Sequence, residues 1–280
     1  MEALRPLLTT YAYNILGSLE EAKDVVQDAF LKFMHIDASR IDDKKAYLVR
    51  TVINLSINAK KKLQKMKAGY TGEWLPEPIA TEQADTAINR REVLSYSLMV
   101  LLEKLNPKQR AVFILKEAFD YDHEEIARAL DITVENSRKL LSRAKSQLKE
   151  DALPDSSVPP GYLGKYLEVI QKGDTARLEQ LLNEDIVAIS DGGGKAPAFI
   201  NPIYGRKDVI AGMLGIFKKT LSMSASLRLE EKIINHQPAL YYYVDDKLVT
   251  CQIFSVREGI IENIWLIRNP DKLKSLEKIS

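Results

Sequence analysis

The sequence lacks several features that would place it in a specialised class. One cysteine among 280 residues, Cys251, leaves no partner for an internal disulfide and fits a reducing compartment, so we expect a cytoplasmic protein. No 18-residue apolar run is present, which excludes an ordinary membrane-spanning helix, and the first residues lack the basic start of a signal peptide. The formal net charge is only +1, so any nucleic-acid signal must be local.

The spacing of apolar residues changes along the chain from a helical pattern to a strand pattern. Apolar residues recur at helical three-and-four spacing through about 4–67 and again through 88–150. After a stretch rich in proline and serine, short helical patterns at 162–171, 175–182 and 207–219 precede four period-two segments at 224–234, 239–246, 247–257 and 260–267. The order predicts a multidomain protein in which two all-α domains precede an α+β domain with antiparallel strands.

The segment 119–148, FDYDHEEIARALDITVENSRKLLSRAKSQL, predicts a helix-turn-helix. Asp122 and Glu125 have the spacing of a capping box at the start of the first helix. Asp131 tolerates left-handed backbone in the turn, and Thr133 can cap the second helix. Polar and basic side chains project outward from that second helix, which suits the major groove of DNA. The competing interpretation is a solvated basic helix in an ordinary helical hairpin.

A lysine run, KKKLQKMK at 60–67, is the other basic feature. Alone it describes a solvated helix end that the helix dipole favours. Two local basic features in a nearly neutral chain together favour a nucleic-acid-binding surface.

Three segments resemble the extracytoplasmic-function sigma factors of bacterial RNA polymerase: GSLEEAKDVVQDAFLKFM at 17–34, KAYLVRTVINLSINAKKK at 45–62, and 105–148. The resemblance implies that the first segment docks on the polymerase clamp through Asp24, Gln27 and Asp28. It implies contacts with the −10 promoter element by Arg50, Asn54, Lys60, Lys61 and Lys62. It implies contacts with the −35 element by Thr133, Glu135, Asn136, Arg138, Lys139, Ser142 and Arg143.

Two positions depart from the family pattern. Ser137 stands where valine is usual on the inward face of the recognition helix, and a buried serine there needs a backbone partner or costs stability. Tyr47 replaces the usual tryptophan, which is a milder change.

Three further motifs narrow the resemblance to one sigma subgroup, which has a SnoaL-like (polyketide-cyclase-like) C-terminal extension. They are YTGEWLPEP at 70–78, DGGGK at 191–195 and NPDKL at 269–273. In that subgroup the extension replaces a separate anti-sigma protein. The resemblance therefore implies a regulatory set of Tyr70, Trp74, Leu75, Pro76, Glu77, Pro78, Asp191, Gly192, Gly193, Gly194, Lys195, Asn269, Pro270, Asp271, Lys272 and Leu273.

The linker motif also has a physical interpretation of its own. Pro76 and Pro78 keep the chain extended and reduce the entropy lost on docking. Trp74 and Leu75 form a compact apolar anchor, and Tyr70 adds an amphipathic contact. An extended segment of this kind can bind in a groove on another domain. The C-terminal domain is the candidate, because it is part of the same chain and is therefore present at high effective concentration. We therefore expect Trp74 to be largely buried against that domain.

The C-terminal domain offers few groups for catalysis. The candidates are His236, Asp191 and the tyrosines 241, 242 and 243, and His236 lies in NHQP, which is typical of a turn. DGGGK does not match the phosphate-binding Walker pattern, because its first glycine is misplaced and Ala196 follows the lysine. We expect no catalytic residue, no cofactor and no metal site, and we prefer an interdomain contact for this motif on the family resemblance.

The sequence as a whole predicts a promoter-specific transcription initiation factor regulated by its own C-terminal domain. The expected domains are region 2 at 1–67, a linker at 68–88, region 4 at 89–152, a linker at 153–160 and the SnoaL-like domain at 161–280. The expected partners are core RNA polymerase and promoter DNA, and we expect no binding to a membrane. The free protein is expected to be a monomer. Two alternatives remain open: a bifunctional sigma factor whose cone binds or converts a small molecule, and a promoter-binding regulator that never joins polymerase.

Overall fold

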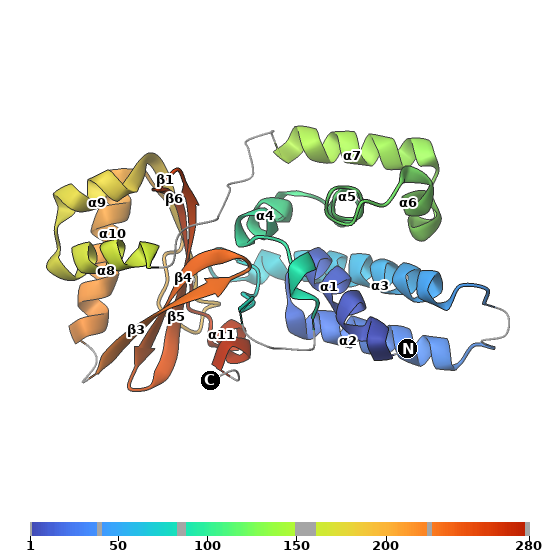
Figure 1. Ribbon diagram of the computed structural model, residues 1–280, viewed down its shortest axis with the longest axis horizontal. Coiled ribbons are helices and arrows are strands. Elements are labelled where there is room, and N and C mark those ends of the chain that lie inside the picture. The colour runs from blue at the N-terminus through green and yellow to red at the C-terminus, as the bar shows by residue number, and fades with distance from the viewer. Residues whose placement is uncertain (1, 38–40, 83–87, 149–160, 223–225, 278–280) are drawn as a thin grey trace. The chain divides into compact units, whose positions relative to one another are not determined.

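The computed structural model describes residues 2–37, 41–82, 88–148, 161–222 and 226–277 (Figure 1). The chain divides into two compact units. The N-terminal unit comprises Met1–Ala68, Ala84–Leu94 and Leu98–Ala152, and the C-terminal unit comprises Gly69–Gln83, Ser95–Ser97 and Leu153–Ser280. The predicted linker at 153–160 lies outside the described residues, as do residues 83–87 of the first linker.

Three mutually packed helices form the first half of the N-terminal unit. They are α1(Arg5–Leu16), α2(Leu19–Met34) and α3(Lys44–Met66), with short 3₁₀ turns η1(Glu2–Leu4) and η3(Lys67–Gly69) at the ends. Gly17 ends α1 in the left-handed region at φ 75°, and the Ser18 hydroxyl accepts from the backbone N–H of Glu21 to cap α2. Gly17 and Ser18 thus separate the first two helices.

The second half of the N-terminal unit is also helical. Its elements are η4(Arg90–Glu92), α4(Tyr96–Leu101), η5(Leu102–Lys104), α5(Pro107–Phe113), a π-helical turn η6(Ile114–Ala118), α6(His123–Leu130) and α7(Val134–Leu148). Asn106 and Gln109 form a capping box at α5, with Pro107 in its first turn. Helix α7 packs on α5 and α6, and these two also pack against α3.

Helices α6 and α7 form the predicted helix-turn-helix. Asp122 and Glu125 make a reciprocal capping box, and Asp131 takes the left-handed conformation at φ 52°. The Thr133 hydroxyl accepts from the backbone N–H of Asn136, 3.1 Å away. Buried Ser137 lies 2.9 Å from Nδ1 of His123, so a side chain rather than the backbone supplies the partner that this serine requires.

The C-terminal unit is a six-stranded sheet with helices on it. The strand order is β2-β1-β6-β5-β4-β3, and all neighbours are antiparallel except β1 and β6. The strands are β1(Leu182–Asp191), β2(Ile203–Tyr204), β3(Leu227–Ile234), β4(Gln237–Val244), β5(Lys247–Arg257) and β6(Ile260–Ile267). Asp245, Asp246, Glu258 and Gly259 take positive φ in the hairpin turns that join β4 to β5 and β5 to β6. This confirms an α+β domain of the SnoaL-like cone type, while the parallel β1–β6 pair was not predicted.

The two faces of this sheet carry different elements. Helices α8(Tyr162–Lys172), α9(Thr175–Leu181) and α10(Arg206–Ser222) cover one face, where Tyr166, Phe217, Leu240 and Phe254 belong to one apolar core (Figure 1). The short helix α11(Pro270–Glu277) lies on the other side, against β5. The C-terminal end of β1 and the start of α11 therefore meet at the edge of that second face, where DGGGK and NPDKL stand.

Candidate functional site

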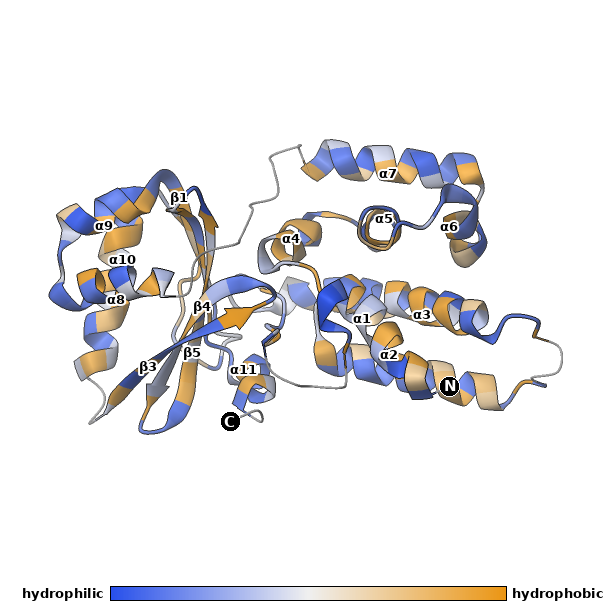
Figure 2. Ribbon diagram, viewed as in Figure 1, coloured by the Kyte–Doolittle hydropathy of each residue, from blue (hydrophilic) through white to orange (hydrophobic). Residues whose placement is uncertain are grey.

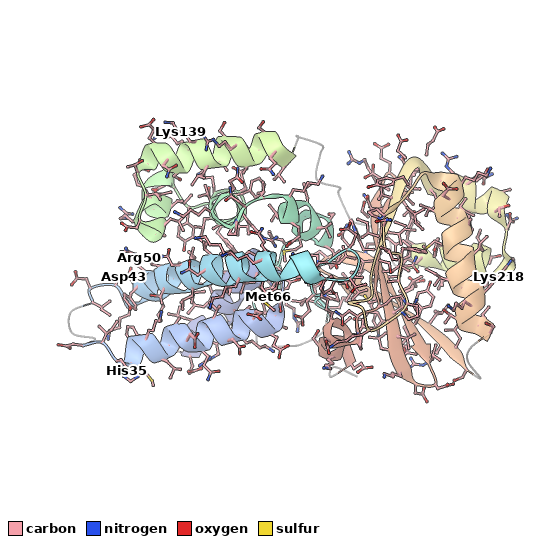
Figure 3. The ribbon with its side chains drawn as sticks, turned by 180° about the vertical axis from the view of Figure 1, so that it is seen from behind. His35, Asp43, Arg50, Met66, Lys139 and Lys218 are labelled. Atoms are coloured by element: carbon pink, nitrogen blue, oxygen red, sulfur yellow. The ribbon has the colours of Figure 1, made fainter. Side chains whose placement is uncertain are left out.

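The outer side of α7 is open to solvent. Figure 2 shows this helix as mostly hydrophilic, and Figure 3 shows Lys139 projecting from the side of α7 that faces away from α3. Within α7, Lys139 pairs with Glu135 one turn earlier, 2.6 Å apart, which is an exposed ion pair that DNA phosphates can replace. Every residue that the sequence assigned to −35 recognition is exposed: Thr133, Glu135, Asn136, Arg138, Lys139, Ser142 and Arg143.

The residues assigned to the −10 element divide into two groups on α3. Arg50, Lys61 and Lys62 are exposed. Asn54 is half-buried, and its side-chain amide donates to the backbone carbonyl of Ala129 on α6, 2.8 Å away. Lys60 is completely buried in an ionic cluster, because the side of α3 on which it lies packs against the second helical half. The expectation that Lys60 faces DNA is therefore wrong for this conformation.

The residues assigned to polymerase docking lie on the exposed side of α2. Asp24, Gln27 and Asp28 are all exposed there. Beyond them, the end of α2 and the following turn leave large apolar side chains in solvent, with Met34 71% exposed and Leu31 43% exposed. Acidic and apolar groups side by side suit a protein-docking surface.

The motifs YTGEWLPEP, DGGGK and NPDKL meet at one carboxylate in the C-terminal unit. Asp191, at the end of β1, is fully buried. Its carboxylate accepts from the Tyr70 hydroxyl at 2.5 Å and from the backbone N–H of Leu75 at 2.9 Å. The Lys272 ammonium of α11 lies 2.6 Å from the same carboxylate and also donates to the Leu75 carbonyl. One buried anion thus binds the linker and the C-terminal helix together, and we call this the Asp191 site.

Backbone geometry shapes the Asp191 site. The backbone N–H groups of Arg268 and Asn269 both donate to the Asp191 carbonyl, at 2.8 and 2.9 Å. The Asn269 side chain donates to the Tyr70 oxygen at 3.0 Å. Gly193 has φ +60°, and a Cβ there would come within 2.2 Å of the Asn269 amide nitrogen. This position of the glycine motif therefore permits a close approach that no larger residue allows.

The Tyr70 hydroxyl stays protonated and serves as a donor in the Asp191 site. Burial is the main cause that raises the pKa of Tyr70 above its usual range, and the hydrogen bond to Asp191 raises it further. A neutral phenol can donate its proton to the Asp191 carboxylate while its oxygen accepts from the Asn269 amide, so both hydrogen bonds are made.

Leu75 is the most deeply buried apolar side chain of the linker motif. It is only 2% exposed, and Pro76, Glu77 and Pro78 after it are buried as well. Trp74 is partly buried, and the Lys272 ammonium lies 4.1 Å from the centre of its ring. The indole therefore covers the cation that binds Asp191, while Leu75 is the residue removed from solvent.

The remaining residues of the DGGGK and NPDKL motifs lie around the Asp191 site, some exposed and some buried. Lys195 and Asp271 form an exposed ion pair, and Lys195 together with Lys274 lowers the pKa of Asp271 below its usual range. Pro270 begins α11, and Leu273 on that helix is buried. Gly192 accepts the N–H groups of Lys195 and Ala196 in a tight turn.

The linker also pairs with the sheet itself. Residues 79–81 run beside the β3–β4 turn, where Ile79 exchanges two hydrogen bonds with Asn235 at 2.9 Å each. Thr81 donates its N–H to the Ile233 carbonyl at 3.1 Å. The linker therefore extends the edge of the sheet by a short β-bridge, which is a common way to bind an extended peptide.

Sequence reasoning missed a second contact with the C-terminal unit, at Ser95–Ser97. Tyr96 is fully buried, with its ring 5.5 Å from that of Trp265 and its hydroxyl donating to the Pro76 carbonyl at 2.7 Å. The N–H of Ser97 donates to the Gln237 side chain at 2.7 Å. A lone tyrosine at the start of a helical pattern gives no signal that separates this contact from ordinary core packing.

The groups considered for catalysis do not form an acid–base constellation. His236 is exposed in the β3–β4 turn at φ 61°, as predicted for a turn. Inside the cone the Tyr242 hydroxyl donates to the Gln252 amide oxygen at 2.5 Å, and the Gln252 nitrogen donates to Tyr166 at 3.1 Å. Among the described residues, no three His, Cys, Asp or Glu side chains are grouped to hold a metal ion.

Comparisons with known proteins agree with this geometry. The family Sigma-70 region 2 matches residues 1–66, and Sigma-70, region 4 matches residues 95–148. These two modules, in this order, define a sigma factor of RNA polymerase. No helix in the described part of the chain is both long and apolar enough to cross a membrane.

Full-length relatives narrow the class. The chain is 30% identical to the ECF RNA polymerase sigma factor SigJ of Mycobacterium tuberculosis, over 97% of this chain and 91% of that protein. It is 25% identical to the probable ECF sigma factor SigI of the same species, over 98% and 93% of the two chains. The crystal structure of SigJ superposes with a TM-score of 0.76 at 28% identity, covering 98% and 97%. The chain therefore belongs to the extracytoplasmic-function (ECF) sigma factors.

Proposed function

We propose that this ECF sigma factor is regulated by its own C-terminal unit, which binds the linker between the two DNA-reading regions. The observation that supports the proposal is the buried Asp191 carboxylate, which accepts hydrogen bonds from Tyr70 and Leu75 of the linker. A linker bound in this way has a fixed path, and the positions of the regions at its two ends depend on that path.

The chemistry of the Asp191 site suits regulation more than permanent structure. Most of its contacts are hydrogen bonds to a single buried anion, so they are directional and are lost together when the carboxylate is lost. Because the linker is tethered to the unit that binds it, modest contacts suffice to hold it. The site can thus be stable in the free protein and still be displaced by a partner that binds the linker or α11.

The remaining roles follow the family. The protein acts in the cytoplasm, docks on core polymerase through Asp24, Gln27 and Asp28, and reads the −35 element with the exposed residues of α7. Arg50, Lys61 and Lys62 of α3 are the −10 contacts that are exposed in this conformation.

Run-off transcription with core polymerase tests the regulatory proposal. The Lys272→Ala chain loses a cation that bridges Asp191, the Leu75 carbonyl and the Trp74 ring, and we expect transcription to rise. Lys274→Ala is the matched control on the same helix, since Lys274 is exposed and pairs with the exposed carboxylate of Asp271. Deletion after about residue 155 is expected to lower transcription, whereas deletion from about residue 269 is expected to raise it. Equal transcription by all of these chains would contradict regulation by the C-terminal unit.

A further inference from the structure

We propose that His123 is a positioning residue for −35 recognition, which fixes the orientation of the DNA-reading end of α7 through a hydrogen bond to Ser137. Nδ1 of His123 lies 2.9 Å from the Ser137 hydroxyl oxygen. The proposal rests on the proposed role of α7 at the −35 element, and it does not involve the C-terminal unit. His123 is not one of the residues assigned to DNA, so its effect on recognition passes through Ser137.

The two ends of α7 are attached to the N-terminal unit in different ways. The buried residues of the helix are Ser137, Ala144 and Leu148. Near the C-terminal end of α7, the Gln147 side chain also donates to the Lys104 carbonyl at 2.6 Å. Over 134–143, by contrast, Ser137 is the one buried residue, and the apolar residues of that stretch are covered only in part. The first half of the helix therefore depends on Ser137 for its attachment.

Ser137 lies among the residues that are assigned to the −35 element. Asn136 and Arg138 are its immediate neighbours, and both are exposed. Because consecutive helical residues point about 100° apart, a rotation of α7 that moves Ser137 also redirects these two side chains. The N-terminal residues of a recognition helix are those that contact base edges. The partner of Ser137 thus controls where the base-reading groups point.

Serine cannot hold this position by shape alone. The valine that is usual here has two methyl groups to pack, whereas serine has one hydroxyl, which is costly to bury without a partner. A serine in a helix can bond to the carbonyl four residues earlier, but the Thr133 carbonyl already accepts the Ser137 N–H at 3.0 Å. The bond to His123 instead crosses to α6. Because a hydrogen bond is directional, it fixes the rotation of α7 as well as its distance from α6.

His123 is itself held in a defined place. It is the first residue of α6 and follows Asp122, whose side chain accepts from the backbone N–H of Glu125 in the capping box. Just before the helix, the Tyr121 N–H donates to the Leu115 carbonyl at 2.9 Å. The backbone on both sides of His123 is therefore fixed, and a single hydrogen bond from this residue can orient the next helix.

Substitutions at the two positions separate this role from ordinary packing. His123→Ala leaves the Ser137 hydroxyl buried without its partner. His123→Asn keeps a polar atom close to the place of Nδ1, because the amide branches at the same side-chain carbon as the imidazole. Ser137→Val removes the hydroxyl and supplies the residue that is usual in the family. Alanine and asparagine are both uncharged, so a difference between the two variants at position 123 does not reflect charge.

Selection of DNA by the holoenzyme tests the proposal. Holoenzyme is formed from the full-length chain and core polymerase, and it selects from duplexes that are randomised over the upstream half of a promoter. The readout is the affinity for the selected sequence relative to random DNA at one salt concentration. We expect His123→Ala to lower this ratio by about tenfold or more, as when a base contact is lost, while His123→Asn stays within about threefold of the wild type. Affinity for random DNA should change by less than about twofold, because the phosphate-contacting charges of α7 remain.

The Ser137→Val background is the decisive comparison. There His123→Ala should change the ratio by less than about twofold, since no hydroxyl then needs a partner. A tenfold loss in that background too would show that His123 does not act through Ser137, and an unchanged ratio in His123→Ala alone would equally overturn the proposal. Ser146→Ala, at an exposed serine of the same helix, is the control and should have no effect. A wild-type holoenzyme that selects no upstream sequence would instead contradict the role of α7 at the −35 element, and this proposal with it.

Hydrogen exchange in the free full-length chain supplies a second measurement, which needs no DNA. His123→Ala should speed the exchange of the amides at 138–142 by about tenfold and leave those at 144–148 within about twofold of the wild type, because the second half of α7 keeps its own contacts. Ser137→Val in the same chain should restore slow exchange in the first half. Equal acceleration in both halves would indicate a general loss of stability rather than a released helix end, and it would overturn the proposal, as would no acceleration at all.

Discussion

Glu103 in the N-terminal unit and Asp191 in the C-terminal unit are both carboxylates removed from solvent, with side chains 15% and 0% exposed. Each collects donors from segments far apart in the sequence. Their partners differ in kind, because Glu103 contacts three cationic side chains, whereas Asp191 contacts one cation, one phenol and one backbone N–H. The first site balances charge, and the second recognises the path of a polypeptide.

This difference predicts how specific each site is. Charges attract over several ångströms and tolerate rearrangement, so the three cations around Glu103 can regroup in more than one geometry. A backbone N–H donates in one direction only, and the N–H of Leu75 has the correct position only when the linker takes the observed path. We therefore expect the Asp191 site to be sensitive to small changes of shape, and four substitutions test that expectation.

The largest effect is expected from Asp191→Ala. The change leaves the Lys272 ammonium and the Leu75 N–H without their acceptor, which should reduce the free energy of unfolding of the C-terminal unit by about 3–5 kcal/mol. Both tryptophans, Trp74 and Trp265, lie in that unit, so urea denaturation followed by tryptophan fluorescence reports it. Asp185→Ala, at an exposed position on the same strand, is the control and should change the value by less than about 0.5 kcal/mol.

Gly193→Ala comes next, with an expected loss of about 2–3 kcal/mol. Part of this is the general cost of a side chain at positive φ, about 1–2 kcal/mol. Gly173→Ala measures that part alone, since Gly173 has φ +66° and nothing within 4 Å of an added Cβ. The excess at Gly193 measures the displacement of Asn269, and equal losses at the two glycines would show that the close approach has no energetic weight.

A smaller effect is expected from Tyr70→Phe. The change removes one donor to a buried carboxylate while the ring can stay in place, which should cost about 1.5 kcal/mol in the same denaturation experiment. Tyr204→Phe is the matched control, because Tyr204 is 66% exposed. A loss near zero for Tyr70→Phe would mean that water replaces the phenol at Asp191.

The smallest effect is expected from Lys195→Ala, although Lys195 belongs to the same motif as Asp191. Its ion pair with Asp271 is exposed on both sides, at 57% and 45%, and such pairs contribute about 0.2–1 kcal/mol. Raising the salt concentration should reduce the difference from the wild type further. A loss as large as that of Asp191→Ala would indicate that Lys195 supports the site in a way that its contacts do not reveal.

The local structure could be predicted wherever neighbouring residues determine it. Caps at Ser18, Asn106 and Asp122 and the left-handed Asp131 follow from side-chain chemistry within one helical turn. The period-two strands and the recognition helix follow from hydrophobic spacing. The pairing of β1 with β6 could not be predicted this way, because it joins segments separated by one helix and four strands.

At the candidate site the residues were predicted better than their roles. Resemblance to a sigma subgroup selected the linker and both C-terminal motifs, which the structure brings together at Asp191. Trp74 and Leu75 were expected to form the anchor together, and Leu75 is the one that is almost completely buried. Lys60 was grouped with Lys61 and Lys62 because they are adjacent, yet consecutive helical residues point 100° apart and only Lys60 faces the second half.

The contact of Tyr96 with Trp265 has a kinetic consequence. The C-terminal unit holds the chain at two separate places, around residues 70–81 and at Ser95–Ser97. When one of these contacts dissociates, the other still holds the freed segment close to the C-terminal unit. Rebinding is then an intramolecular event that competes with full dissociation. Spontaneous release of the whole linker should therefore be much rarer than the opening of either contact. A partner that occupies one place just after it opens would convert these brief openings into lasting activation.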